Sequence, residues 1–335
     1  MVKFLLVRFS SIGDIVLTTP VIRCLKQQVK NAEIHFLVKK QFYPVLKANP
    51  YIDRLHQLDN NFGALISVLR KENFHHIIDL HHNLRTFRLK WRLRILSFSF
   101  NKLNAKKWLL VNLKINKLPD IHIVDRYLQT VRLFDVVNDN KGLDYHIPAE
   151  EEIHITDLPD GYQQGFIIIV IGAKHFTKQM PNDKLVELCN HIVSPVVLLG
   201  GNEDFKKAED VRNNCAKEVL NLCGRYSINQ SASLIKQSEL VITPDTGLMH
   251  IAAAFGKRII SLWGNTIPEF GMFPYQAHHD SRIFQVHHLS CRPCTKIGFK
   301  KCPRKHFKCM NDIDIKEVIR YSNKLLKKPY SLRRD

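Results

Sequence analysis

Thirteen residues near the amino terminus combine the residue types of a ligand-binding turn with a single carboxylate. The stretch SSIGDIVLTTPVI, residues 10–22, follows the apolar run VKFLLVR and leads into a helical pattern. Ser10 and Ser11 offer hydroxyl groups, and Gly13 lets the backbone approach a ligand closely. Asp14 stands where the helix should begin. It is therefore either the N-cap of that helix or a catalytic carboxylate.

A second stretch, VITPDTGLMHIAAAF at residues 241–255, is typical of an anion-binding turn. A strand ends at Thr243, and the next four residues turn the chain into a helix. The first amides of this helix carry the positive end of the helix dipole, which suits a diphosphate. A carboxylate suits a sugar hydroxyl better than a phosphate, and the histidine either donates to the ligand or is a core histidine bonded to the backbone. The candidate ligand-binding residues here are Asp245, Thr246, Gly247, Leu248, Met249 and His250.

Two further loops follow apolar strands and have residues that could contact a nucleotide-sugar. The loop IGAKHFTKQMP, residues 171–181, carries Lys174 and Lys178, whose ammonium groups either bind phosphate oxygens or remain solvated. The loop LLGGNED, residues 198–204, places Glu203 where it either holds ribose hydroxyls or caps the next helix. No loop in the chain has the glycine spacing of a dinucleotide-binding turn or of a P-loop.

The order of apolar patterns along the 335 residues predicts the architecture. Strand and helix patterns alternate, stop at the polar stretch 138–164, and then alternate again. We expect an α/β protein with two Rossmann-like, doubly wound domains that face each other across a ligand-binding cleft. The expected divisions are a first domain at residues 1–155, a second domain at 156–312, and a C-terminal helix with a basic tail at 313–335 that could pack back on the first domain. Pro20 either kinks the first helix or marks its true start.

The charge of the chain is strongly basic and unevenly distributed. Lys and Arg number 50 against 31 Asp and Glu, which gives a net charge of +19. From Arg85 to Lys117 there are ten basic residues and no acidic one, with Trp91, Trp108 and leucines between them. The segment is either a solvated face or a site for an anionic partner such as a membrane surface, a phosphorylated glycolipid or a nucleic acid. No nucleic-acid-binding motif accompanies it.

Four of the eight cysteines are grouped near the carboxyl terminus, at Cys291, Cys294, Cys302 and Cys309. The first two have a spacing found in metal sites, whereas the last two are farther apart than is usual for zinc. The group either holds a structural metal or consists of reduced thiols in a basic loop. No uncharged apolar stretch reaches 18 residues, and the apolar run at the start is too short for a secretory signal, so we expect a cytoplasmic protein.

Taken together, these stretches resemble glycosyltransferase family 9, which includes heptosyltransferases of lipopolysaccharide synthesis. The similarity rests on SSIGDIVLTTPVI, IIDLHHNLR, the spacing of Gly172, Lys178 and Pro181, GGNE, DTGLMHIAAA and SLWGNT, in this order. The resemblance implies a GT-B fold, an ADP-sugar donor and an inverting mechanism without a catalytic metal or other cofactor. Pro244 stands where many members have Asn, and the lysine loop lacks the usual aromatic residue before its proline.

The resemblance also implies roles for individual residues. Asp14 matches the catalytic base, Lys178 a donor-binding lysine and Glu203 a ribose-binding glutamate. The stretch from Asp245 to His250 matches the donor-sugar and diphosphate contacts. Arg85, together with Ser10, Ser11 and Gly13, would face the acceptor. The resemblance thus makes residues 1–155 the acceptor domain and residues 156–312 the nucleotide-sugar domain.

The expected function is transfer of a heptose or related sugar from an ADP-sugar to an anionic glycolipid of the lipopolysaccharide-core type, by an enzyme attached peripherally to the cytoplasmic membrane. The alternatives are a nucleotide-sugar epimerase or hydrolase of the same fold, or a basic nucleic-acid-binding protein.

Overall fold

The computed structural model describes residues 1–327 and divides into two compact units. The first unit comprises Met1–Leu103 and Asp120–Pro148, and the second comprises Asn104–Pro119 and the chain from Ala149 onward. The units divide at Pro148, seven residues before the position expected from the sequence. The expected basic tail at residues 328–335 lies outside the described residues.

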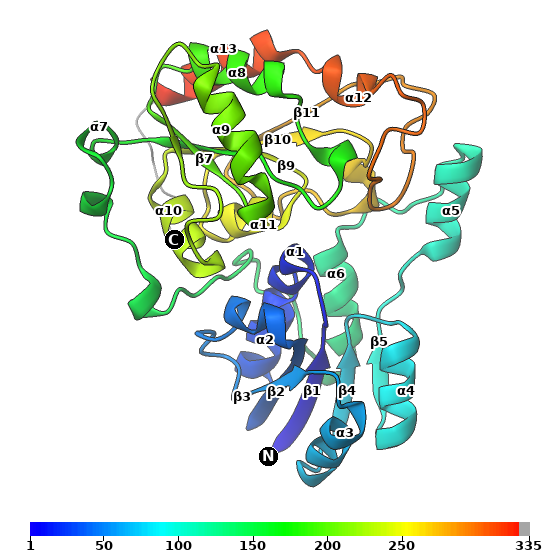
Figure 1. The fold of residues 1–335 in the computed structure, drawn as a ribbon. Coiled ribbons are helices and arrows are strands. Elements are labelled where there is room, and N and C mark those ends of the chain that lie inside the picture. The colour runs from blue at the N-terminus through cyan, green and yellow to red at the C-terminus, as the bar shows by residue number, and fades with distance from the viewer. Residues whose placement is uncertain (328–335) are drawn as a thin grey trace. The chain divides into compact units, whose positions relative to one another are not determined.

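The first unit is built on a five-stranded parallel sheet with the order β3-β2-β1-β4-β5 (Figure 1). The central strand β1 is mostly apolar and is buried from Phe4 to Val7, and its neighbour β4 is buried from Ile77 to Asp79, as expected for a sheet covered on both faces. The strands are β1 (Val2–Val7), β2 (Ala32–Lys39), β3 (Arg54–Leu58), β4 (His76–Asp79) and β5 (Ser97–Ser99).

Short helices connect the strands of the first unit and cover its sheet. The single helix expected after β1 is two helices, and the second begins at Thr19 with Pro20 in its first turn. Proline fits there because the first helical amides need no partner within the helix. The helices are α1 (Ile12–Val16), α2 (Thr19–Gln28), η1 (Lys40–Val45), α3 (Phe62–Lys71), α4 (Leu84–Leu93), α6 (Ile123–Leu128) and η2 (Gln129–Phe134).

The second unit contains a six-stranded parallel sheet with the order β11-β10-β9-β6-β7-β8. This is the strand order of a Rossmann-like fold, whose ligands bind outside the carboxyl ends of the strands. The central strands are continuous apolar runs because both faces are buried. The strands are β6 (Ile167–Val170), β7 (Val196–Leu199), β8 (Val219–Asn221), β9 (Leu240–Pro244), β10 (Ile259–Trp263) and β11 (Arg282–Gln285).

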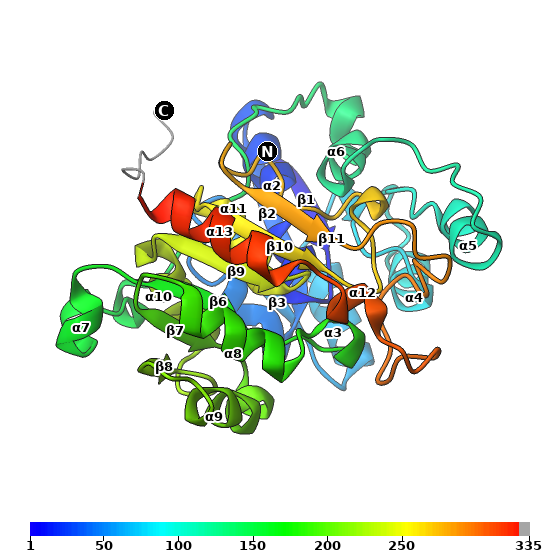
Figure 2. The same ribbon diagram turned by 90° about the horizontal axis from the view of Figure 1, so that it is seen from above.

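The helices of the second unit pack around this sheet. Figure 2 shows α8 and α13 lying on one face of it. The α-helices are α5 (Asn104–Leu113), α7 (Asp160–Gln163), α8 (Asn182–His191), α9 (Phe205–Asn213), α10 (Ile228–Gln237), α11 (Gly247–Ala254), α12 (Lys308–Asn311) and α13 (Ile315–Leu326). The short 3-10 helices are η3 (Ala149–Glu151), η4 (Ile155–Asp157), η5 (Phe176–Lys178), η6 (Asn202–Asp204) and η7 (Pro268–Phe270).

The C-terminal helix α13 belongs to the second unit, and packing of the C-terminal segment back on the first domain stays a prediction. Ile315, Val318 and Leu325 lie on one side of the helix and are buried in the core beneath α8. The amphipathic pattern required an apolar partner, and the nearest one is the second unit's own sheet.

The basic segment 85–117 is divided between the two units. Helix α4 belongs to the first unit, whereas α5 belongs to the second. Leu110 of α5 packs against Ile267 and Phe270, and Lys114 Nζ donates to the carbonyl oxygen of Pro293 at 2.8 Å. The segment is therefore not one continuous charged face. No helix within residues 1–327 is both long enough and apolar enough to cross a membrane.

Candidate functional site

In the first unit, Asp14 stabilises the turn between β1 and α1 without being its N-cap. The N-cap is Ser11, and Asp14 is the third residue of the helix. The Asp14 Oδ2 atom accepts a hydrogen bond from the Ser11 backbone N–H at 3.1 Å and from the Ser11 hydroxyl at 2.8 Å. Ser10 and Gly13 flank this pair, and Gly13 is buried. The structure thus brings the four predicted residues of this turn together.

Arg8, which the sequence analysis missed, forms an ion pair with Asp14. The Arg8 Nη2 and Asp14 Oδ1 atoms are 2.5 Å apart, and the Asp14 side chain is only 20% exposed. Burial would raise the pKa of the Asp14 carboxyl, but the Arg8 guanidinium and the hydrogen bonds from Ser11 outweigh burial and hold that pKa below its usual value. Asp14 is therefore ionised at neutral pH. In the sequence, the sign of this role is that Arg8 directly follows the apolar run of β1.

The Arg8 guanidinium is fixed from several sides. It donates to the carbonyl oxygens of Ser10 at 2.7 Å and Leu80 at 2.6 Å, and to the Tyr127 hydroxyl at 3.1 Å. Arg8 is only 8% exposed, so these contacts replace the water that a surface arginine would bind. Arg8 thereby holds the Asp14 carboxylate in a single orientation.

The end of β4 places a second group of polar side chains at the carboxyl edge of the same sheet. Asp79 is fully buried and forms an ion pair with Lys90 at 3.0 Å. The Nδ1 atom of His81 is buried and has no hydrogen-bond partner among the described residues, and burial lowers the His81 pKa to about 4. The predicted acceptor residue Arg85 is exposed on α4, where it lines a small cavity with Arg88.

In the second unit, two predicted donor-binding residues contact each other directly. The Lys178 Nζ atom lies 2.6 Å from Asp245 Oδ2, and the Thr266 hydroxyl donates to the same carboxylate oxygen at 3.0 Å. Lys178 ends η5 in the loop after β6, Asp245 follows β9, and Thr266 follows β10. Three neighbouring strands therefore deliver one cation, one carboxylate and one hydroxyl to the same edge of the sheet.

Helix α11 begins immediately beside this pair. Thr246 is its N-cap, in extended conformation, and Gly247 is its first residue. Thr246, Gly247 and Leu248 are partly exposed, whereas Met249 and His250 are buried. The first turn of α11 therefore presents backbone amides beside the Lys178 ammonium, which is the chemistry of an anion site. Met249 packs in the core, and His250 lies one turn inside the helix.

Glu203 lies apart from these contacts, and its neighbour Asp204 has the structural role at this turn. Glu203 is exposed in η6, after β7. Asp204 is 6% exposed, and its Oδ2 atom accepts a hydrogen bond from the Gly201 N–H at 2.9 Å. A Cβ atom at Gly172, which follows β6, would lie 1.9 Å from the same oxygen, so a larger residue would not fit there. The ribose role of Glu203 remains a prediction.

Asn265 is a further candidate that the sequence analysis missed. Its side chain is 1% exposed, yet neither its amide nitrogen nor its amide oxygen has a hydrogen-bond partner among the described residues. The Asn265 backbone is fixed by a hydrogen bond from its N–H to the Thr177 carbonyl, next to Lys178. An unsatisfied buried amide is costly unless a ligand or water completes it. The signal was the motif GNT that directly follows β10.

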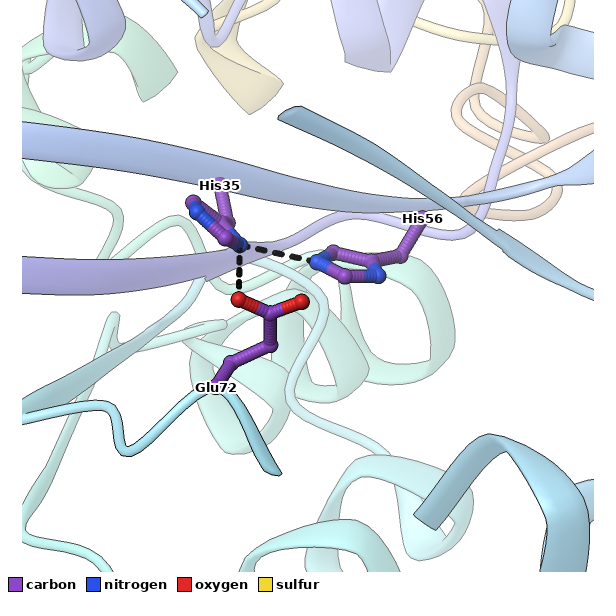
Figure 3. Close-up of side chains that lie close together, drawn as sticks. All are labelled: His35, His56 and Glu72. Carbon is purple, nitrogen blue, oxygen red and sulfur yellow. Dashed lines mark hydrogen bonds and ion pairs between the residues drawn. The ribbon is translucent and has the colours of Figure 1, made fainter. Parts of the chain in front are cut away.

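Two groups of side chains among residues 1–327 have the composition and proximity of metal ligands. Figure 3 shows one group in the first unit, where His35, His56 and Glu72 converge. His35 Nδ1 lies 2.9 Å from His56 Nε2, but the Glu72 carboxylate already pairs with Arg54 and with Lys3. A second group is formed by His278, His279 and Asp280.

The sulfur atoms of the cysteine group lie farther apart than the ligand atoms of these two clusters. No three of Cys291, Cys294, Cys302 and Cys309 have their sulfur atoms within 4.8 Å of one another. Burial, with Cys291 beside it, raises the pKa of the Cys294 thiol to about 11.

Comparisons with known proteins agree with this fold. The solved structure of a glycosyl transferase of family 9 from Veillonella parvula covers 97% of both chains with a TM-score of 0.78 and 21% identity. The structure of the E. coli ADP-heptose lps heptosyltransferase II covers 97% of this chain and 98% of its own, with a TM-score of 0.75 and 19% identity. The fold is therefore that of these proteins, the GT-B fold, which contains two Rossmann-like units.

Curated relatives are similar in sequence over most of the chain. Lipopolysaccharide heptosyltransferase 1 of Campylobacter coli is 26% identical over 292 residues, which cover 79% of this chain and 84% of that protein. Lipopolysaccharide heptosyltransferase 3 of E. coli K12 is 26% identical over 276 residues, which cover 76% and 80%. The family model described as glycosyltransferase family 9 (heptosyltransferase) matches residues 62–305. The chain belongs to glycosyltransferase family 9 and is a glycosyltransferase.

Proposed function

We propose that this glycosyltransferase transfers a heptose, or a related sugar, from an ADP-sugar to an anionic glycolipid of the lipopolysaccharide-core type. The relatives named as lipopolysaccharide heptosyltransferases support the sugar and the acceptor class. The similar structure of the E. coli ADP-heptose lps heptosyltransferase II supports the donor. The single observation that carries the proposal is the group formed by Lys178, Asp245 and Thr266 beside the first turn of α11.

In this proposal, the second unit binds the donor. The diphosphate accepts hydrogen bonds from the amides of Thr246, Gly247 and Leu248 and from the Lys178 ammonium. Charge that develops on the leaving ADP is stabilised there, because the donors are fixed before the reaction begins. Asp245 and the buried amide of Asn265 contact hydroxyl groups of the sugar or ribose, and Glu203 and His250 complete the donor site.

The first unit supplies the base. The Asp14 carboxylate accepts the proton of the acceptor hydroxyl while that oxygen attacks the anomeric carbon, the bond to ADP breaks, and the configuration inverts. The low pKa of Asp14 keeps the carboxylate ionised, and the acceptor proton is lost late, when its acidity has risen. Ser10, Ser11, Gly13 and Arg85 position the acceptor.

The acceptor class also accounts for the basic residues of helix α4 in the first unit. A phosphorylated lipid acceptor at the cytoplasmic leaflet lies in a negative surface potential, which attracts Lys and Arg side chains. We therefore propose peripheral association with an anionic membrane surface from the cytoplasmic side.

The test is incubation of the enzyme with a panel of ADP- and UDP-sugars and truncated lipid A–core acceptors, with products identified by mass spectrometry. The expected product is the acceptor plus one heptose, formed only from an ADP-sugar. A free sugar without acceptor, or an epimerised nucleotide-sugar, would show that the chain is a hydrolase or an epimerase instead.

A further inference from the structure

Helix α4 of the first unit has two apolar faces, and only one of them is covered. Leu89 and Leu93 are buried against the sheet and α3, which fixes the helix to the unit. On the other side, Leu84, Phe87 and Trp91 are 84%, 63% and 67% exposed. Their spacing of three and four residues places them in one stripe along the helix. Figure 1 shows α4 beside α3 at the margin of the first unit.

Arginines flank this apolar stripe, and two of them are held in place. The guanidinium carbons of Arg88 and Arg92 lie 5.9 Å and 5.7 Å from the centre of the Phe62 ring. A ring face attracts a guanidinium, so these side chains are directed along the α3 side of the helix. Lys90 differs, because its ammonium group is held by the buried Asp79.

A polar cavity opens beside the stripe, between α3 and α4. Its volume is about 480 Å³, and its wall includes Arg70, Trp91, Arg92 and Arg94. Arg70 donates one hydrogen bond to the Arg92 carbonyl oxygen at 2.9 Å, so the Arg70 side chain is directed across the cavity. Three guanidinium groups around one cavity, with no carboxylate in its wall, suit a phosphate group.

We propose that the outer face of α4 docks on a bilayer that contains anionic phospholipid. Leu84, Phe87 and Trp91 enter the boundary between headgroups and acyl chains, and the cavity of Arg70, Arg92 and Arg94 receives a lipid phosphate. Amphipathic helices with aromatic residues on one face and arginines beside it bind membranes in this way. The inference deepens the membrane association proposed above and rests on it.

The charge of the chain argues for a membrane rather than a second copy of the protein. Helix α4 and its C-cap carry Arg85, Arg88, Arg92 and Arg94 and no acidic residue, and the whole chain carries a net charge of +19. A second copy would bring a like charge to the arginine-lined face, whereas an anionic leaflet brings the opposite charge. The apolar stripe would gain little from a nucleic-acid backbone, which offers phosphates but no apolar phase.

The first experiment measures sedimentation of the full chain with vesicles of phosphatidylglycerol and phosphatidylcholine. Phe87→Ser and Trp91→Ser should each weaken binding to the anionic vesicles roughly tenfold, because each loses a buried apolar side chain in the bound state. Leu133→Ser is the matched control, since Leu133 is 77% exposed in the same unit but lies outside α4. If the parent chain binds the vesicles and both α4 variants bind them equally well, α4 is not the docking face, although membrane association itself stands.

The second experiment follows the fluorescence of Trp91. Trp108→Phe leaves Trp91 and Trp263, and Trp263 is buried in β10, so a change in emission reports on Trp91. Anionic vesicles should shift the emission to shorter wavelength, and lipids brominated near the headgroup should quench it. Soluble glycerol phosphate at equal ionic strength should do neither. A shift with glycerol phosphate alone would show a free-phosphate site and contradict the membrane assignment.

The outcomes separate this inference from the proposed function. Absence of vesicle binding by the parent chain would remove both the membrane association and the docking face, while sugar transfer to a soluble, delipidated acceptor would still test the reaction. Salt-sensitive RNA binding that is lost in Arg92→Gln but kept in Phe87→Ser would overturn the inference in favour of a nucleic-acid surface.

Discussion

Lys178 and Asp245, which lie 67 residues apart in the sequence, form an ion pair of 2.6 Å beside the amino terminus of α11. The cation proposed to bind the donor diphosphate is thus already neutralised by a carboxylate. A diphosphate that reaches Lys178 must share the ammonium group with Asp245 or displace the carboxylate. Replacing Lys178 should therefore weaken the binding of ADP, whereas replacing Asp245 should not.

Lys178→Met should weaken ADP binding by about tenfold or more, because a hydrogen bond to a charged group contributes about 1.5–3 kcal/mol. Asp245→Asn should leave ADP affinity unchanged or tighten it a few-fold, since Lys178 loses its competitor, while turnover of the ADP-sugar falls. Calorimetry with ADP and product assays with the ADP-sugar measure the two effects. Weaker ADP binding in Asp245→Asn would show that Asp245 orients Lys178 instead.

Asp14→Asn should reduce sugar transfer by about 10²- to 10⁴-fold, because the amide cannot accept the acceptor proton. The amide oxygen can still accept hydrogen bonds from Ser11, so the turn should persist. ADP affinity, measured by calorimetry, should stay within a few-fold of the parent value. Transfer at the parent rate in Asp14→Asn would assign Asp14 to the helix turn alone.

Asn265→Leu separates a ligand contact from a structural role. The leucine side chain is of similar size and removes a buried amide that has no partner among the described residues, so thermal stability should be unchanged or higher. Affinity for the ADP-sugar should fall, because the contact proposed for the amide is lost. A large loss of stability in the variant would mean that the amide is satisfied in the protein without its donor.

The stability of the first unit should fall as the pH decreases below 6.5, partly because of His56. Burial, and then the charges of His35, Arg54 and Lys3, lower the His56 pKa to about 4, and Glu72 opposes them only in part. The unfolded chain binds a proton near pH 6.5, so this contribution is complete above that value and is lost as the pH falls toward 4.

Between pH 7.5 and 5.5, the His56 contribution should decrease by about 1.3 kcal/mol. His56→Gln offers both an N–H and a carbonyl oxygen for the hydrogen bond with His35 but does not titrate. Denaturant unfolding at the two pH values should show a smaller decrease for His56→Gln than for the parent chain. Equal decreases in both proteins would exclude His56 as a source.

Lys90 should matter for stability, unlike the neighbouring arginines of α4. Lys90→Met leaves the fully buried Asp79 without its cation and should cost about 3 kcal/mol, whereas Arg88→Met on the exposed face should cost about 0.5 kcal/mol or less. Asp79→Asn in the Lys90→Met background should recover part of the loss, because the charge is then removed. Denaturant unfolding of the three variants measures this, and equal costs for Lys90→Met and Arg88→Met would contradict the buried pair.

The sequence alone determined the fold class and the positions of the ligand-binding turns. Alternating apolar patterns predicted the central strands of both sheets, and the residues after β1, β6 and β9 were identified because glycine, threonine and charged residues follow apolar runs there. Such signals are local, since each depends on residues within one turn or one strand. The short edge strands β5, β8 and β11 were not predicted, because segments of three or four residues show little periodicity.

Only the tertiary structure decided which charged groups face each other. Arg8 with Asp14, Lys90 with Asp79, and Lys178 with Asp245 are buried or partly buried pairs. Lys178 and Asp245 come from loops that meet because β6 and β9 are neighbours in the sheet. Strand order follows from the packing of the whole unit, and no local pattern encodes it. For the same reason, the basic segment 85–117 looked continuous in the sequence, but the core contacts of Leu89 and Leu110 assign its two helices to different units.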